Sequence, residues 1–524
     1  MKLLKPAFIP KLIMAFFVLV ELALIVIGYL YVADLLVVSE ADPNLVLFIF
    51  AGIIVVNILC SIYIINSTVS DAYKITWLFF VNALPLIGFI FYLIFANKQT
   101  SRSQRRKYIK WSRNIQKEDA DPAVLEMVKE DLPGSTPLIR YLASVSGSGI
   151  YRDTSVEYFS LGDYAFPKML EELKKAKHYI FMEFFIYAPG VFWDSILEIL
   201  KEKAAQGVDV RVLYDDVGCL GTLPFDYKKE LEKFGIKAGV FEPFRPLLDI
   251  RMNNRDHRKI MVIDGHTCFT GGCNIADEYI NKCVRFGHWK DNMIMLKGQG
   301  VYGFTLMFLS TWCSLFTPNE KIDRSAYLPA KYIDEAGGFP KSDGYVQPFG
   351  DLPYDDDAVG ETVYLSLIQH AESFIYISTP YLLIDSKMES ALINAALSGV
   401  EVHILTPHIP DKKAVFHMTR SYYGGLLKSG VHIHEYTPGF VHEKTFLVDG
   451  KVATVGTINL DYRSLYLHSE CGTLLVNCKA VDDMKKDFED TFSKSEEITR
   501  ERWEKWYKRH MAYWAVLRIF APLM

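Results

Sequence analysis

The sequence predicts an α/β protein of two pseudo-symmetric halves that share one cleft, preceded by N-terminal transmembrane helices. Three observations support this prediction: a duplicated His-x-Lys-x4-Asp motif, alternating strand-like and helix-like segments around each copy, and three apolar stretches in the first hundred residues. A chain of 524 residues has room for two or three domains. Half of its residues are hydrophobic, and the excess is concentrated at the N-terminus.

Residues 1–97 are expected to form the membrane region. The apolar stretches cover residues 12–38, 45–65 and 75–96, and each approaches or exceeds the roughly 20 residues of a spanning helix. Glu21 in the first stretch costs roughly 2.5–3.5 kcal/mol if it lies at mid-bilayer. Pro85 and Gly88 break the third stretch, so it either kinks or re-enters. We therefore expect two or three spans in a multi-pass protein of the cell membrane.

A basic juxtamembrane linker is expected at residues 98–144. Lysines and arginines without intervening acids follow the third stretch, at Lys98, Arg102, Arg105, Arg106, Lys107, Lys110 and Arg113. The positive-inside rule keeps such a run, and the rest of the chain after it, in the cytoplasm. Each of these charges also contributes about 1 kcal/mol to the binding of anionic lipid head groups. The N-terminal lysines prefer the same side, so either the N-terminus is exported or one stretch does not span.

The remaining chain contains an internal repeat, with halves expected at residues 145–335 and 336–495. Strand-like residues 176–187 parallel residues 371–381, and residues 207–214 parallel residues 399–406. Helix-like segments lie between them at residues 195–205 and 388–397. This alternation predicts largely parallel sheets that helices cover on both faces.

Each half carries one copy of the motif, at His257, Lys259 and Asp264 in the first and at His442, Lys444 and Asp449 in the second. Both copies read as a strand that runs into an Asp-Gly turn. Side chains at i and i+2 of a strand share a face, so each His points the same way as its Lys. Each Asp either pairs with a Lys or stabilises the turn. The second copy follows the first by 185 residues with a similar tail, which indicates two halves of one active site.

The residue types suit phosphodiester chemistry. A histidine acts as a nucleophile or as a general acid/base, and a lysine beside it stabilises an oxyanion. Asn274 and Asn459 follow the two motifs at the same offset and offer amide donors for phosphoryl oxygens. A metal site is the alternative, but a lysine next to each histidine disfavours a cation, and no paired metal-ligand spacing surrounds either motif.

At these residues the chain resembles the phospholipase D superfamily, and the fuller signature resembles bacterial cardiolipin synthases. The resemblance rests on Arg255-Asp-His-Arg-Lys-Ile260 and on Asn459-Leu-Asp-Tyr-Arg-Ser464 followed by Glu470. Gly272 departs from the family, which usually has Ser or Thr at this position, whereas Thr457 keeps the hydroxyl and is expected to contact phosphate in the second half.

The resemblance implies roles for individual residues. His257 would be the nucleophile that becomes a phosphohistidine, and His442 the acid/base; the sequence alone leaves the reverse assignment open. Asp291 and Glu470 would orient the two imidazole rings. The two histidines must act from opposite protonation states. Neither a metal nor an organic cofactor is expected.

The resemblance also implies the substrates, phosphatidylglycerol and anionic membrane lipids. Transfer to a second phosphatidylglycerol would give cardiolipin and glycerol. The alternative is a membrane-bound phospholipase D that hydrolyses or transphosphatidylates other phospholipids. A net charge of −5 argues against a nuclease or any other nucleic-acid partner, and two intact motifs argue against a non-catalytic scaffold. The oligomeric state is left open.

Residues 496–524 are expected to form an amphipathic tail. Five aromatic residues (Trp503, Trp506, Tyr507, Tyr513 and Trp514) alternate with basic ones, which is typical of an interfacial helix. A helix packed on the second half is the alternative. The eight cysteines show no disulfide framework and are expected to be buried thiols.

Overall fold

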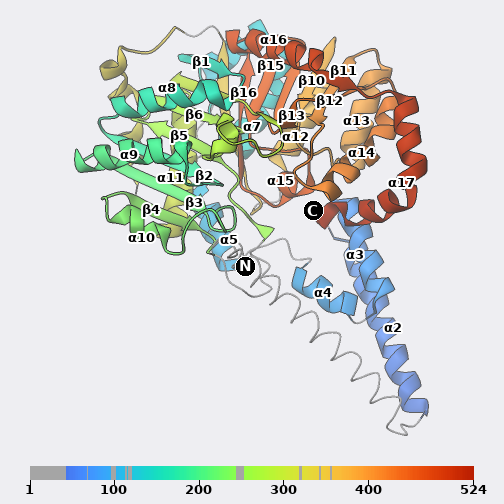
Figure 1. The fold of residues 1–524 in the computed structure, drawn as a ribbon. Coiled ribbons are helices and arrows are strands. Elements are labelled where there is room, and N and C mark those ends of the chain that lie inside the picture. The colour runs from blue at the N-terminus through green and yellow to red at the C-terminus, as the bar shows by residue number, and fades with distance from the viewer. Residues whose placement is uncertain are drawn as a thin grey trace, which may run out of the picture.

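The computed structural model of the chain describes residues 43–67, 69–85, 87–95, 102–112, 115, 121–243, 253–317, 322–341, 344–354 and 357–523. The two predicted halves are present as two sheets that lie side by side (Figure 1). The first apolar stretch, residues 12–38, lies outside the described residues.

The first half is built on a sheet with strand order β1-β8-β6-β5-β2-β3-β4. Its strands are β1 (Thr154–Phe159), β2 (Tyr179–Phe184), β3 (Asp209–Asp215), β4 (Lys237–Phe241), β5 (Lys259–Ile263), β6 (Thr267–Gly271) and β8 (Met293–Gly298). Its helices are α8 (Gly162–Lys175), α9 (Val191–Ala205), α10 (Tyr227–Glu232) and α11 (Val301–Phe316). Helix α11 is buried along most of its length because it lies between the two halves and contributes to their shared core.

The second half repeats this order as β9-β16-β15-β14-β10-β11-β12 and adds β17 beside β12. Its strands are β9 (Tyr345–Asp351), β10 (Phe374–Ser378), β11 (Glu401–Pro407), β12 (His432–Tyr436), β14 (Thr445–Val448), β15 (Val452–Gly456), β16 (Glu470–Val476) and β17 (Ser495–Glu497). Its helices are α12 (Val359–Gln369), α13 (Ser386–Leu397), α14 (Lys413–Lys428), α15 (Tyr462–Tyr466) and α16 (Lys479–Ser493). The matching order confirms the internal repeat.

The prediction of largely parallel sheets is wrong. The described strands pair in parallel within β2-β3-β4 and β10-β11-β12, and antiparallel elsewhere in both sheets. The motif strands β5 and β14 each turn directly back into β6 and β15. Asp264 and Gly265 have φ of 48° and 66°, and Asp449 and Gly450 have φ of 52° and 65°. Asp-Gly with positive φ at both positions is the type I′ pattern, which joins neighbouring antiparallel strands.

Two of the predicted apolar stretches fall on described helices. Residues 45–65 lie in α2 (Pro43–Ile65), which extends away from the two halves in Figure 1. The third stretch is divided, as Pro85 suggested, into α3 (Asp71–Ala83) and α4 (Ile87–Phe95). Among the described residues, no helix meets the length and hydropathy needed to cross a membrane.

Residues 98–144, expected to be a basic juxtamembrane linker, contain α5 (Arg102–Trp111), α6 (Pro122–Asp131) and most of α7 (Thr136–Val145). Asp121 caps α6 by accepting a hydrogen bond from the backbone N–H of Ala123, and Pro122 occupies its first position. Val128 of α6 and Leu142 of α7 are fully buried in the core of the second half. These buried apolar residues hold the helices of a mainly polar segment against the second half.

The C-terminal segment is α17 (Arg500–Phe520) followed by a short turn, Ala521–Leu523, and it packs on α14. The Trp503 indole donates to the Arg420 carbonyl at 2.9 Å, and Trp514 is buried against the same helix. The structure therefore supports the alternative of a helix packed on the second half. The far end of α17 reaches α3, where the Thr76 hydroxyl donates to the Ile519 carbonyl at 2.8 Å. All eight cysteines are free thiols, and all but Cys283 are buried, as predicted.

Candidate active site

The two motif histidines lie at the junction of the halves, each on a segment that pairs with the other half. The His257 backbone N–H donates to the Ser469 carbonyl at 2.9 Å, and the His442 N–H donates to the Lys290 carbonyl at 2.8 Å. A short strand, β13 (Gly439–Val441), precedes His442 and pairs in parallel with β7 (His288–Lys290) of the first half. These backbone contacts between the two halves bring both histidines to one site.

The orienting acids are exchanged between the halves in the same way. The Nδ1 atom of His257 lies 3.0 Å from both carboxylate oxygens of Glu470, which belongs to the second half. The Nδ1 atom of His442 lies 2.7 Å from Oδ2 of Asp291, which belongs to the first half. Both acids are fully buried. A carboxylate at Nδ1 fixes the tautomer whose Nε2 is unprotonated, so each ring presents Nε2 for chemistry.

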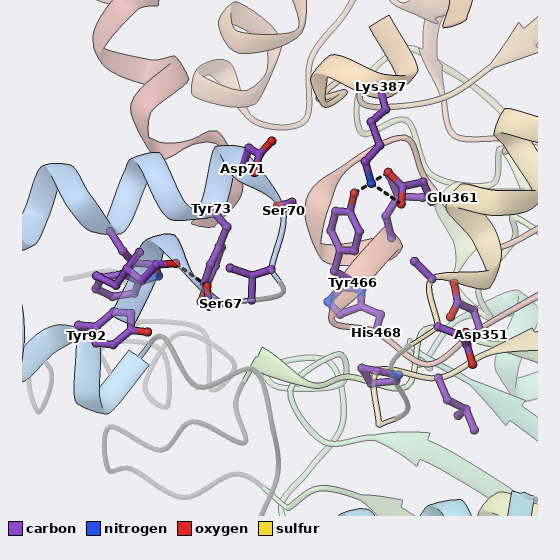
Figure 2. A pocket seen from close by; sticks show the side chains of 18 of the residues that line it. Ser67, Ser70, Asp71, Tyr73, Tyr92, Asp351, Glu361, Lys387, Tyr466 and His468 are labelled. Atoms are coloured by element: carbon purple, nitrogen blue, oxygen red, sulfur yellow. Dashed lines mark hydrogen bonds and ion pairs between the residues drawn. The ribbon is translucent and has the colours of Figure 1, made fainter. Parts of the chain in front are cut away.

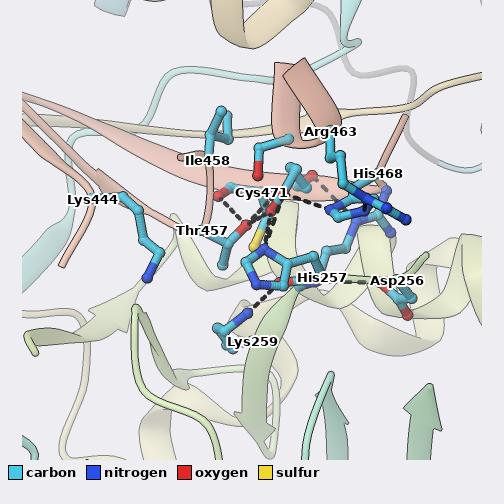
Figure 3. Close-up of polar contacts among 12 residues, drawn as sticks. Asp256, His257, Lys259, Lys444, Thr457, Ile458, Arg463, His468 and Cys471 are labelled. Carbon is cyan, nitrogen blue, oxygen red and sulfur yellow. Dashed lines mark hydrogen bonds and ion pairs between the residues drawn. The ribbon is translucent and has the colours of Figure 1, made fainter. Parts of the chain in front are cut away.

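The two motif lysines converge on the same site. Lys259 donates from Nζ to the His257 carbonyl at 2.6 Å, and Lys444 contacts the His442 carbonyl and lies 2.8 Å from His442 Nδ1. Figure 3 shows Lys259 and Thr457 on either side of the His257 ring, with Lys444 beside this cluster. Each Lys therefore accompanies its His, as the i, i+2 spacing predicted.

Burial and mutual repulsion lower the pKa values of these cations. Burial, followed by the charges of Lys259 and Lys444, lowers the pKa of His257 well below its usual range. Burial and the charge of Lys444 lower the pKa of His442 to about 4, although Asp291 opposes the shift. Burial likewise lowers the pKa of Lys259 to about 7 and that of Lys444 to about 8. These shifts favour the neutral form of both imidazoles before substrate binds, and an incoming phosphodiester anion would favour protonation of one of them.

The motif aspartates lie at the far ends of β5 and β14 and contact backbone rather than the histidines. The Asp264 carboxylate accepts three backbone N–H groups, from Lys177, His178 and Tyr179, each at 2.8 Å. Asp449 accepts the equivalent N–H groups of residues 372, 373 and 374 at 2.7–2.9 Å. The sequence left two roles open for these aspartates, pairing with a lysine or stabilising the turn. The observed contacts support the second role.

The two predicted phosphate-binding asparagines differ in their contacts. Asn274 is committed to the protein, because its Oδ1 accepts from the Ile186 N–H at 3.1 Å and its Nδ2 donates to the Tyr279 hydroxyl at 2.8 Å. Asn459 is also buried, yet its Oδ1 has no hydrogen-bond partner among the described residues. The unpartnered atom of Asn459 is thus an acceptor, and the same side chain also interacts with the Asp461 carboxylate.

The contacts of Thr457 explain the departure at Gly272. The Thr457 hydroxyl donates to Glu470 Oε2 at 2.5 Å, so it supports the acid behind His257. At the equivalent position of the first half, a Cβ on Gly272 would lie 1.8 Å from Oδ1 of Asp291. Aspartate is shorter than glutamate and holds its carboxylate nearer the backbone, so this half requires glycine where the other accommodates threonine.

His468 is a residue of the site that the motifs did not reveal. Its ring centroid lies 5.7 Å from that of His257, and its Nδ1 lies 3.6 Å from Glu470 Oε1. Its position two residues before Glu470 was the available signal, because such residues share a face in extended chain. His257, His468 and Glu470 place one possible metal-ligand atom each within 4.8 Å of one another. The charges of Lys259 and Lys444 on His257 disfavour a cation there.

Known proteins with similar sequences match this arrangement. A family profile described as "Cardiolipin synthase, PLD-like domain" matches residues 169–297 and again residues 364–492, once in each half. A profile described as "Phospholipase_D-nuclease N-terminal" matches residues 55–97.

Individual relatives cover most of the chain. An uncharacterized protein of Streptococcus mutans is 43% identical over 88% of this chain and 99% of its own length. The cardiolipin synthase of Geobacillus kaustophilus is 34% identical over 90% of this chain and 94% of its own length. The crystal structure of phosphatidylserine synthase from Haemophilus influenzae superposes with a TM-score of 0.55 at 14% identity, covering 75% of this chain and all of that chain, which shows a shared fold. The chain therefore belongs to the cardiolipin synthase family, whose catalytic region consists of two phospholipase D-like halves.

Proposed function

We propose that this enzyme is a cardiolipin synthase that transfers the phosphatidyl group of one phosphatidylglycerol to a second, giving cardiolipin and glycerol. The observation that supports this most is the pair of buried histidines, each held at Nδ1 by an acid of the other half. Two such histidines suit a two-step displacement at phosphorus, and cardiolipin synthases at 34% identity cover most of the chain.

In the first step, Nε2 of His257 attacks the phosphorus of phosphatidylglycerol. A P–N bond forms, the P–O bond to the head-group glycerol breaks, and His442 gives its proton to the departing alkoxide. Glu470 stabilises the cationic ring of the phosphohistidine. The neutral His442 of the free site acquires its proton when the phosphate anion binds, since the anion raises its pKa.

In the second step, His442 removes the proton from a primary hydroxyl of a second phosphatidylglycerol. This oxygen attacks phosphorus, the P–N bond breaks, and cardiolipin leaves with both residues restored. Lys259 and Lys444 stabilise the phosphoryl oxygens in both steps, a contribution typically worth a few kcal/mol per donor. Rotation of the Asn459 amide would place Nδ2 where the unpartnered Oδ1 lies, and it would then donate a hydrogen to the same oxygens. The scheme requires neither a metal nor an organic cofactor.

The proposed location is the cell membrane, with several N-terminal spans and the catalytic region in the cytoplasm. The long apolar stretches and the basic residues that follow them support this topology. Membrane attachment keeps both lipid substrates close to the site and favours a lipid hydroxyl over water as acceptor.

Product analysis tests the proposal. Membranes that contain the full chain are supplied with isotopically labelled phosphatidylglycerol, with and without phosphatidylethanolamine, and the labelled lipids are identified by mass. We expect cardiolipin from phosphatidylglycerol alone, and none from His257→Ala or His442→Ala. Phosphatidic acid as the sole product would instead identify a phospholipase D.

A further inference from the structure

A large cavity lies between the N-terminal helices and the second half, next to the active site. It has a volume of about 1390 Å³ and is lined by α2, α3 and α4 on one side and by β9, α12 and α15 on the other (Figure 2). Drug-sized ligand pockets measure roughly 300–1,000 Å³, so this cavity suits a larger ligand. We call it the interhelical cavity.

The two sides of the interhelical cavity differ in chemistry. The wall from α2–α4 combines apolar side chains with polar ones. The apolar ones include Ile64, Trp77, Phe89 and Leu93, and the polar ones are Tyr63, Ser67, Ser70, Asp71, Tyr73 and Tyr92. The wall from the second half carries a polar cluster, in which the Tyr466 hydroxyl donates to Glu361 at 2.8 Å and Lys387 lies 3.7 Å from the same carboxylate. An amphipathic ligand would match both kinds of side chain that line the cavity.

One lining residue connects the cavity to the catalytic histidine. Figure 2 shows His468 beside Tyr466 at the polar wall. The same His468 ring lies 5.7 Å from the His257 ring and 3.6 Å from Glu470. A phosphate group at this end of the cavity would lie one side chain away from the proposed nucleophile.

Helix α2, which lines the cavity, also exposes apolar side chains outward. Ile54, Ile58 and Leu59 of α2 are each more than half exposed. Contiguous exposed apolar side chains of this kind mark a contact with a membrane or a protein. In a membrane enzyme they would place α2 in lipid, so that the cavity behind it is open to a lipid leaving the bilayer.

We propose that the interhelical cavity holds the diacylglycerol part of one phospholipid substrate, with its phosphate directed past His468 toward His257. The inference rests on the proposed function and adds to it the path by which the lipid reaches the site. The apolar side chains of α2–α4 contact the acyl chains. The opposite wall, with Lys387 among the acids Asp351, Asp357 and Glu361, accepts hydrogen bonds from the glycerol hydroxyls of the head group. A soluble phosphodiester without acyl chains does not need the cavity.

Filling the cavity tests this path. Thr362→Trp on α12 and Val69→Trp before α3 each add an indole to the lining. We expect about a tenfold or greater loss of cardiolipin formation from phosphatidylglycerol vesicles, with hydrolysis of bis(p-nitrophenyl) phosphate changed by less than about twofold. Gln369→Trp on α12 and Ile58→Trp on α2 are the matched controls, since neither residue lines the cavity and both are exposed. Unchanged cardiolipin formation, or equal losses on both substrates, would overturn the proposal.

A second measurement does not depend on turnover. Vesicles containing a phosphatidylglycerol with a photoreactive diazirine in one acyl chain are irradiated with the full-length protein, and labelled peptides are mapped by mass. Labelling at Leu352 and Thr362, which line the cavity from the catalytic side, is expected and should fall in Thr362→Trp. Labels restricted to outward residues of α2 would refute the path. A protein that labels at Leu352 but makes no cardiolipin would contradict the proposed function and leave the cavity site standing.

Discussion

Glu470→Gln isolates the contribution of the exchanged acid to the nucleophile. Glu470 is fully buried and accepts from His257 Nδ1 at 3.0 Å and from the Thr457 hydroxyl at 2.5 Å. Glutamine keeps the shape but removes the charge that stabilises the imidazolium of the phosphohistidine. A hydrogen bond to a charged group contributes about 1.5–3 kcal/mol. At about 1.4 kcal/mol per factor of ten, attack on phosphorus should slow by roughly 10–150-fold.

The assay separates the two steps with bis(p-nitrophenyl) phosphate, whose nitrophenolate leaves without a general acid. Rapid mixing should show a burst of nitrophenolate as His257 is phosphorylated, followed by steady turnover. Glu470→Gln should lower the burst rate. Asp291→Asn, the matched variant behind His442, should leave the burst nearly intact and lower the steady rate, because it impairs the general base.

The reverse pattern would refute the assignment of the two histidines. A normal burst in Glu470→Gln would show that the carboxylate does not act on the nucleophile. Unfolding temperatures of both variants provide the control, because a burst lost through unfolding would be accompanied by a large fall in that temperature.

Three further outcomes are expected. Gly272→Ala should lower stability by about 1–3 kcal/mol and impair turnover, because its Cβ would lie 1.8 Å from the Asp291 carboxylate; denaturant unfolding measures this, and an unchanged midpoint would contradict it. Lys259→Met should abolish activity yet raise stability, because burial lowers the pKa of this lysine from 10.5 to about 7 on folding. The buried charge destabilises the wild type fully below pH 7, and this destabilisation disappears as pH rises toward 10.5. Unfolding from pH 6 to 10 should therefore show the variant's advantage shrinking with pH, and a constant advantage would count against the buried cation. Trp514→Ala should destabilise the second half by about 3–5 kcal/mol, since its indole is 2% exposed; a loss confined to membrane binding, with normal unfolding, would favour the interfacial helix.

The repeat and the motif strands could be predicted from the sequence because their signals are local. Apolar runs that end at Asp264-Gly265 and Asp449-Gly450 specified the strands and the turns between them. The same turns could have corrected the expected sheet type, because a tight turn with Asp-Gly at its centre joins antiparallel strands. The prediction of largely parallel sheets was based only on the strand–helix–strand alternation.

Other features depend on contacts between distant residues and have no local signal. The pairing of Glu470 with His257, 213 residues apart, depends on how the two halves pack. The aromatic residues of α17 suggested an interfacial helix, since tryptophan beside arginine is typical of both a membrane surface and a packed helix. The structure shows Trp503 and Trp514 packed on α14, where the Arg420 guanidinium lies 4.0 Å from the ring of Trp506.

The central claim is that one site, assembled from both halves, transfers a phosphatidyl group through His257. The most direct test is to mix the full-length enzyme with phosphatidylglycerol, quench within the first turnover under alkaline conditions that preserve phosphohistidine, and map the modified peptide by mass. We predict a phosphatidyl group on His257 that disappears when excess phosphatidylglycerol is added and labelled cardiolipin forms. A label on His442, or cardiolipin formation without any histidine adduct, would contradict the account.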